Sequence, residues 1–297
     1  MRRGHLLHLL LAALVLVAWL PRATAAGDAL DEIQRRGRLV VGVKKDVPLW
    51  GHLDPRSGLP VGLEPDLAAD LARRLGVRLE LVGLLTAERI DAVARRQVDV
   101  LVATLSDTPD RRQQLRLVLP HYYASGANVM ARRDKGFTRW SDLRNRRVCG
   151  RRGAFYNRAI TVTHGVDVVA VYGNHLALAA LRDGRCDAVL YDDINIIALL
   201  QEPAWLAEFE MPLPTLHVAP WAIAVHPDEG GGRLEARVSH AVADWHRTGL
   251  LLDLQRKWGI PESDFTRRRH EAWTRRLPGG AWYCGDSAGK GTPEDCL

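Results

Sequence analysis

The residues with the clearest chemical potential lie in the segment 97–113. Apart from Asp99, residues 98–103 are apolar and rich in β-branched valine, which predicts a buried strand. Two hydroxyls, Thr104 and Ser106, come directly after it, and Arg111 follows a few residues later. A guanidinium binds a carboxylate through two parallel hydrogen bonds, and hydroxyls add donors. The pattern predicts a site for a small carboxylate, although Arg111 alone could equally be a solvated surface charge.

A predicted helix start brings these groups to one place. Thr108 is a suitable N-cap, Pro109 suits the first helical turn, and Asp110 complements the positive helix end. Backbone N–H groups at such an end favour an anion. The alternative is that Thr108 and Asp110 only cap the helix.

The elements before this segment predict a parallel α/β sheet. We expect strands at 38–43, 77–82 and 98–103, separated by helices at 65–75 and 87–96. In such sheets ligands bind beyond the carboxyl ends of the strands. Trp50 follows the first strand, so we expect it either to cover a pocket or to pack inside the protein.

The same pattern restarts in the second half of the chain. The segment around Asp187 resembles the segment around Asp99, which sets Thr104 and Asp192 at comparable strand ends. The chain crosses between the halves near 123–127 and again near 217–220, and two crossings predict a hinge. We therefore expect an α/β protein with two lobes facing one cleft, with the bounds 27–123 plus 221–265 for lobe 1, 127–216 for lobe 2 and 266–297 for a C-terminal extension.

Both ends of the chain differ from its body. Residues 1–25 have a basic start, an apolar run and the small residues Ala23-Thr24-Ala25, which predicts a cleavable signal peptide; an uncleaved anchor is the alternative. Most of the formal net charge of +6 lies in this segment and after Thr266. The body therefore offers no basic surface for nucleic acid. We expect the extension to be poorly packed on one lobe.

The four cysteines form no C-x-x-C pair, so a zinc or redox site is not indicated. Export to an oxidising compartment favours disulfides, for which three pairings exist. Cys149 and Cys186 lie on segments that should be neighbouring strands, and Cys284 and Cys296 lie together in the extension. We therefore expect the pairs Cys149–Cys186 and Cys284–Cys296.

The order of motifs resembles the family 3 solute-binding proteins, which supply polar amino acids to ABC importers. The resemblance covers 37–264 through G-R-L-V-V-G-V, V-G-L-E-P-D-L-A, V-D-V-L-V-A-T-L-S-D-T-P-D-R-R, L-Y-D-D and D-W-H-R-T-G-L-L-L-D-L-Q-R-K-W. It implies a type II periplasmic-binding-protein-like fold, in which two lobes with mostly parallel sheets flanked by helices share a two-strand hinge. It also implies a periplasmic monomer that binds an amino acid, uses no cofactor or metal, and delivers its ligand to a cognate permease in the inner membrane.

The resemblance also assigns roles. Arg111 corresponds to the arginine that binds the ligand's α-carboxylate, with Thr104 and Ser106 as further ligand contacts. Asp192 corresponds to the acid that pairs with the α-ammonium. The loop at Gly153 corresponds to a loop that donates hydrogen bonds to the ligand's carboxylate. The next two residues here have no side-chain hydroxyl, so only their backbone amides remain as donors. The residues implied there and in the side-chain pocket are Ala154, Phe155, Trp50, Thr86, Arg151 and Tyr191.

Two questions stay open at this stage. Arg151 could select an acidic or amide side chain, or it could point to solvent. Glu64 replaces the family's aspartate, and we interpret it as structural.

Alternative functions are a periplasmic enzyme resembling cyclohexadienyl dehydratase, and a sensor or accessory protein without a transporter. The scattered histidines suggest no catalytic set, so we expect no enzyme activity.

Overall fold

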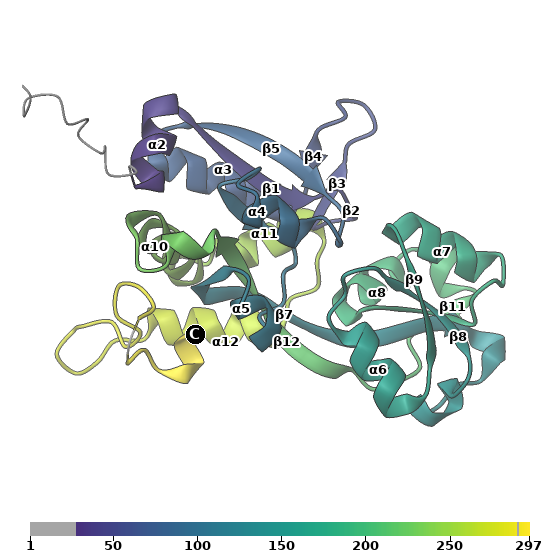
Figure 1. Ribbon diagram of the computed structural model, residues 1–297. Helices are drawn as coiled ribbons and strands as arrows, with labels where there is room; N and C mark the ends of the chain where they lie inside the picture. The colour runs from purple at the N-terminus through teal and green to yellow at the C-terminus, as the bar shows by residue number, and fades with distance from the viewer. Residues whose placement is uncertain (1–27, 290) are drawn as a thin grey trace, which may run out of the picture.

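The computed structural model describes residues 28–289 and 291–297 (Figure 1). The predicted signal peptide lies outside this range. The chain forms two α/β lobes, as expected, with a C-terminal extension beside the first lobe (Figure 1). Within the described residues, no helix combines the length and the apolar character that a bilayer span needs.

Lobe 1 is built on three parallel strands in the order β5-β1-β6. Helices cover both faces of this sheet, because its buried strands alternate their side chains between two apolar clusters. The elements are α2 (Ala29–Arg36), β1 (Arg38–Lys44), α3 (Leu63–Leu75), β5 (Arg78–Leu84), α4 (Arg89–Ala94), β6 (Val100–Val102), α5 (Pro109–Arg112), η4 (Pro227–Glu229), α10 (Arg233–Thr248) and α11 (Leu250–Trp258).

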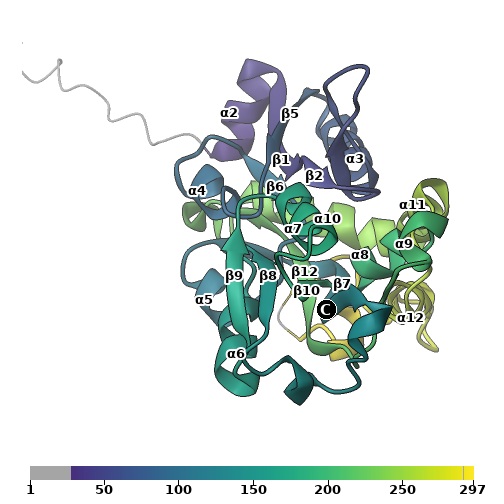
Figure 2. The ribbon, with the colours of Figure 1, turned by 90° about the vertical axis from the view of Figure 1, so that its right-hand side faces the viewer.

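Lobe 2 repeats this plan with the strand order β10-β8-β9, all parallel (Figure 2). One face packs against α6 and η3, and the other against α7, α8 and α9. The elements are η2 (Arg133–Lys135), η3 (Trp140–Leu143), β8 (Arg147–Arg151), α6 (Tyr156–His164), β9 (Asp167–Val171), α7 (Asn174–Arg182), β10 (Ala188–Asp192), α8 (Asp193–Leu199), α9 (Pro203–Leu206) and β11 (Phe209–Glu210). The predicted disulfide Cys149–Cys186 is present in this lobe.

Two long antiparallel strands join the lobes: β7 (Arg116–Arg132) and β12 (Leu216–Val225). The sequence suggests a break at Ser125-Gly126, whereas β7 runs through it and extends the sheet from one lobe into the other. A Cβ at Gly126 would lie 2.3 Å from the Thr215 side chain, so the close approach of the two strands requires glycine here. The two-strand hinge is thus present, and the exact lobe bounds stay a prediction.

A small antiparallel sheet changes the expected position of Trp50. The strands β2 (Asp46–Val47), β3 (Gly51–Leu53) and β4 (Pro60–Val61) turn the loop after β1 back onto lobe 1. Trp50 is fully buried there, with ring centroids 4.5 Å from Tyr123 and 4.7 Å from Trp221. The packing alternative for Trp50 is therefore the one that the structure shows.

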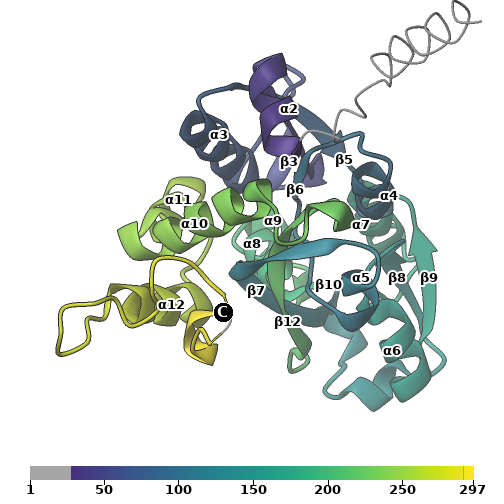
Figure 3. The same cartoon turned by 60° about the vertical axis from the view of Figure 1, so that its left-hand side comes forward.

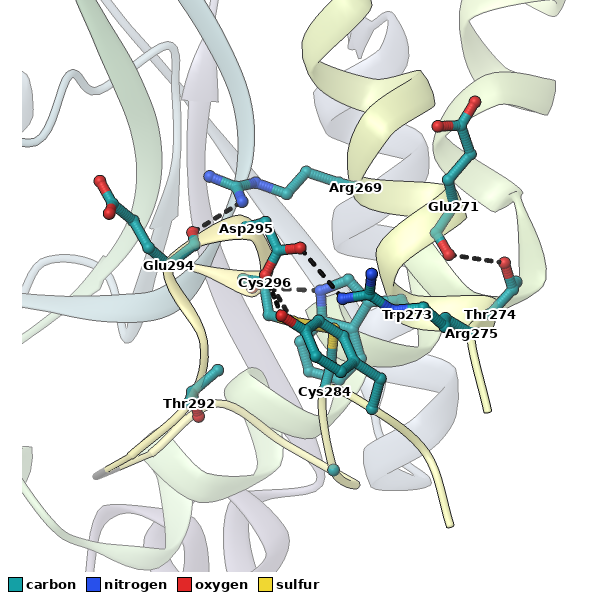
Figure 4. Close-up of a disulfide and its surroundings, with 12 residues drawn as sticks. Arg269, Glu271, Trp273, Thr274, Arg275, Cys284, Thr292, Glu294, Asp295 and Cys296 are labelled. Carbon is teal, nitrogen blue, oxygen red and sulfur yellow. Dashed lines mark hydrogen bonds and ion pairs between the residues drawn. A yellow bond between two sulfur atoms is a disulfide. The ribbon is translucent and has the colours of Figure 1, made fainter. Parts of the chain in front are cut away.

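The C-terminal extension packs on lobe 1 through one helix and a disulfide. Most of its described residues after Thr274 are exposed, so this later part is loosely packed, as expected. The helix α12 (Asp264–Thr274) lies along α10, and the short η5 (Glu294–Cys296) closes back onto α12 (Figures 3 and 4). Trp273 is fully buried, and its Nε1 donates to the carbonyl oxygen of Cys296 at 3.1 Å. The predicted disulfide Cys284–Cys296 sits in the same small core as Ala243 of α10 (Figure 4). The extension is thus a structured part of the lobe 1 surface.

Candidate functional site

A small polar cavity lies where the strand ends of the two lobes meet. Its volume is about 10 Å³ for a water-sized molecule, which is about the space that one water needs. A ligand of amino-acid size therefore enters only if the lobes move apart. The residues that line it are Thr86, Arg89, Thr104, Ser106, Arg111, Arg151, Ala154, Phe155, Tyr156 and Asp192.

Eight of the ten residues that the sequence suggests for the site line this cavity. The two exceptions are Trp50 and Tyr191. Trp50 belongs to the lobe 1 core, as described above. Tyr191 lies one residue before Asp192 on β10, so its side chain points to the opposite face of the sheet. It still supports the site, because the Arg151 guanidinium lies 3.9 Å from its ring centroid.

Arg111 occupies the position that the local sequence predicts. The Thr108 side chain caps α5 by accepting from the Arg111 N–H, and Pro109 stands in the first turn. The Arg111 side chain is 5 % exposed, and its Nη1 donates to the carbonyl oxygen of Ser106 at 2.7 Å. Its Nη2 donates across the cleft to the carbonyl oxygen of Gly153 at 3.2 Å. Burial, together with the nearby Arg89, lowers the pKa of Arg111 to about 9.

The backbone at Thr104 is held in an unusual conformation beside Arg111. Thr104 has a φ of 46°, and its N–H donates to Glu64 Oε1 at 2.5 Å and to the Tyr122 hydroxyl at 3.0 Å. Burial raises the pKa of Glu64 to about 8, so this carboxyl is largely protonated at neutral pH. The interpretation of Glu64 as structural therefore agrees with its position, because it fixes the strand end that presents Thr104.

Arg89 is a site residue that sequence reasoning missed. It is 3 % exposed and stands at the start of α4. Its Nε donates to the Thr86 carbonyl at 3.0 Å, and its Nη1 donates to the carbonyls of Ala103 and Thr104 at 2.8 and 2.7 Å. The signal was its helical spacing to the buried Ala92 and Val93, which places an arginine on the inward face of this helix. Tyr156, the second missed residue, opens α6.

Arg151 and Asp192 form a buried ion pair at the ends of two neighbouring strands of lobe 2. Arg151 Nη2 donates to Asp192 Oδ2, and also to the Tyr156 hydroxyl at 2.9 Å. Arg151 is 3 % exposed, so it does not point to solvent. Burial opposes its charge, but Tyr156 and Asp192 more than offset this and raise its pKa. One oxygen of Asp192 is thus already paired before any ligand ammonium approaches.

The loop after β8 also differs from expectation. The Ala154 N–H donates to the carbonyl oxygen of Arg151 at 3.1 Å, so this amide is engaged in a turn. Phe155 contributes its ring, whose centroid lies 5.7 Å from the Arg111 guanidinium. The loop therefore meets Arg111 through a carbonyl and an aromatic ring in this state.

A second set of contacts across the cleft involves a buried lysine. Lys44 Nζ lies 2.9 Å from Asp46 Oδ1 and donates to Thr86 Oγ1 at 3.0 Å. Burial lowers the pKa of Lys44 to about 7, although Asp46 opposes this shift. Asp46 Oδ2 accepts from the N–H of Asn174 of lobe 2 at 2.9 Å. The structure therefore shows the lobes in contact, with the cavity enclosed between them.

Comparisons with known proteins agree with this architecture. The family model described as bacterial extracellular solute-binding proteins, family 3, matches residues 39–261. The glutamine-binding protein of Geobacillus stearothermophilus is 27% identical over 176 residues, which is 57% of this chain and 67% of that protein. ABC transporter arginine-binding protein 1 of Escherichia coli is 24% identical over 248 residues, which is 82% of this chain and 98% of that protein.

A solved structure matches both lobes. The crystal structure of the P235GK mutant of ArgBP from T. maritima has a TM-score of 0.71 and 26% identity, covering 78% of this chain and 100% of that one. The residues that the family model matches, 39–261, span both lobes and the hinge and stop before α12. The chain belongs to the family 3 bacterial extracellular solute-binding proteins.

Proposed function

We propose that this protein binds an amino acid or a close analogue between its lobes and delivers it to an ABC importer. The observation that supports this most is the position of Arg111, a buried guanidinium of lobe 1 that reaches lobe 2 through Gly153. A ligand carboxylate at Arg111 would bridge the lobes and favour their closure. Relatives named as glutamine- and arginine-binding proteins are consistent with a free amino acid as the ligand.

The cellular setting follows from the same proposal. The predicted signal peptide and the disulfides suit a periplasmic protein, and the partner is a permease of the inner membrane. We expect the protein to act as a monomer, because the two lobes of one chain complete the site.

The enzymatic alternative finds less support in the site. No histidine is among the residues that line the cavity. The acidic lining residue, Asp192, is paired with Arg151, and Lys44 is held by Asp46 and Thr86 outside the cavity. These groups are arranged to balance charges rather than to transfer protons to a substrate.

A thermal-shift screen of the mature protein against the proteinogenic amino acids, with glutarate and succinate as simple dicarboxylate analogues, tests the proposal. A ligand that binds only the folded protein stabilises it by about 3–4 kcal/mol at 100–1,000 times its Kd. We expect one chemical group of amino acids to raise the melting temperature. The absence of a shift with every amino acid and dicarboxylate at millimolar concentration would contradict the function. Incubation of a binding compound with the protein, followed by chromatography, should return the compound unchanged.

A further inference from the structure

The cavity contains more positive than negative charge. Arg89, Arg111 and Arg151 all line it, and Asp192 is the one carboxylate among the lining residues. All four residues are at most 5 % exposed. Solvent therefore screens these charges poorly, and their balance affects any molecule that enters.

The single carboxylate is already engaged. Asp192 Oδ2 accepts from Arg151, as described above, and also from Asn195 Nδ2 at 3.4 Å. Arg89 and Arg111 have no carboxylate within 4.0 Å among residues 28–289 and 291–297; the protein groups bonded to them are carbonyl oxygens and one hydroxyl. Two buried guanidinium charges are thus left without a negative partner.

Nearby ionisable groups do not correct this imbalance. Lys44 is paired with Asp46, so the two together add no positive charge beside the cavity, and it is the three arginines that set its positive charge. Glu64 is largely protonated at neutral pH because burial raises its pKa to about 8. Burial lowers the pKa values of Arg111 and Arg89 to about 9 and 10, with further repulsion of Arg111 by Arg89 and of Arg89 by Arg151. The charge that the site lacks is therefore negative.

We propose that the ligand carries a net negative charge through two carboxylates, one bound at Arg111 and a second that offsets the charge of Arg89. This inference rests on the proposed function, because it names the ligand class of the same site. A zwitterionic amino acid has no net charge and would leave both guanidinium charges unbalanced. An acidic amino acid would leave one of them unbalanced. A dicarboxylate without an amine would balance both. A cationic amino acid such as arginine would add to the excess positive charge. We therefore do not expect arginine as the ligand of this chain, although relatives are named for arginine.

Matched ligands of equal length separate charge from shape. Calorimetric titrations of the wild-type protein would use L-glutamate against L-glutamine, L-aspartate against L-asparagine, and glutarate, succinate and L-arginine. We expect at least one acidic compound to bind at least tenfold more tightly than its amide, a difference of about 1.4 kcal/mol. If glutarate or succinate binds as tightly as the acidic amino acids do, plain dicarboxylates are the ligand class.

The results distinguish a failure of the charge inference from a failure of the proposed function. An amide or L-arginine that binds as tightly as the acidic compounds would overturn the charge inference and leave amino-acid binding intact. No binding by any compound would overturn the proposed function and the inference with it.

A pair of variants in lobe 2 tests the source of the selectivity. Arg151→Gln removes one guanidinium and frees Asp192, so the preference for the acid over the amide should fall several-fold. Arg152→Gln is the matched control, because Arg152 is the adjacent, exposed arginine. An unchanged preference in a folded Arg151→Gln protein would overturn the inference; if that variant fails to fold, the wild-type series decides.

Discussion

Arg111 Nη2 of lobe 1 donates a hydrogen bond to the carbonyl oxygen of Gly153 in lobe 2 at 3.2 Å. The group proposed to bind the ligand therefore also holds the lobes together in this structure. An incoming carboxylate competes with a neutral carbonyl for the same guanidinium, and the carboxylate has the advantage because its charge is opposite to that of Arg111. Ligand binding should thus replace the existing contact between Arg111 and Gly153, in a protein whose lobes already touch without a ligand.

Gly153 itself offers a steric test of closure. A Cβ at this position would lie 3.1 Å from the Thr86 carbonyl and 3.1 Å from Ala87 Cα, both in lobe 1. Gly153→Ala should therefore hold the lobes apart, increase the radius of gyration in X-ray scattering and weaken ligand binding.

Gly184→Ala is the matched control for this variant. Both glycines have a positive φ, 83° at Gly153 and 69° at Gly184, but a Cβ at Gly184 meets nothing within 4 Å. Both variants should lose about 1 kcal/mol of stability from backbone strain, while only Gly153→Ala should open the cleft. Equal radii of gyration for the two variants would show that Gly153 does not control closure.

Asp46 makes the second contact between the lobes. Its Oδ2 accepts from the Asn174 N–H at 2.9 Å, while its Oδ1 faces Lys44. Asp46→Ala should favour the open state, because it removes the bond to lobe 2 and the partner of Lys44. Lys44, whose pKa is already about 7, should then lose its proton rather than stay buried as an unpaired charge. The expected cost is about 1–3 kcal/mol of stability, measured by denaturant unfolding.

Asp54→Ala serves as the control for Asp46→Ala. Asp54 lies on an exposed turn of the same lobe, where its side chain accepts from Arg56 and Ser57 of that turn. Its loss should leave both the radius of gyration and ligand affinity at the wild-type values. Equal effects of the two substitutions would mean that the Lys44–Asp46 pair has no special role between the lobes.

Some of these features were predictable from the sequence and others were not. The position of Arg111 was predictable, because its strand, its Thr108 cap and its helix are encoded within one short segment. The orientation of Trp50 was not, since it depends on how β2, β3 and β4 pair after the first strand.

Longer-range packing explains the other differences. The spacing of Arg89 to Ala92 and Val93 indicates an inward-facing arginine, but only the fold brings that face of the helix to the strand ends. The small core of the extension, around Trp273, was missed because it includes Ala243 of a distant helix. The Arg151–Asp192 pair likewise joins two strands that are separated in the sequence.

His246 predicts how stability depends on pH at the junction with the extension. Its Nε2 lies 2.7 Å from the carbonyl oxygen of His121, and its ring is stacked with Trp273, with centroids 6.5 Å apart. Burial lowers its pKa from 6.5 to about 3 in the folded protein. Between these values the unfolded chain binds the proton more readily, so stability falls as the pH drops below about 6.5, by about 2 kcal/mol at pH 5.

His246→Gln should reduce this loss of stability between pH 6.5 and pH 5, as measured by urea unfolding at both values. His240→Gln on the same helix is the control, because His240 is exposed and should leave the pH dependence unchanged. The interpretation fails if wild type and His246→Gln lose stability in parallel over this range.

The most direct test of a carboxylate site at the lobe interface is a calorimetric titration of wild type, Arg111→Ala and Arg112→Ala. The titrant is the compound that gives the largest shift in the thermal screen. Arg112 is the adjacent control, since its side chain is 55% exposed and pairs with Asp107. Arg111→Ala should lose about 2–5 kcal/mol of binding free energy, at least about thirtyfold in Kd, while Arg112→Ala stays within about twofold. Wild-type affinity in a folded Arg111→Ala protein would contradict the carboxylate site.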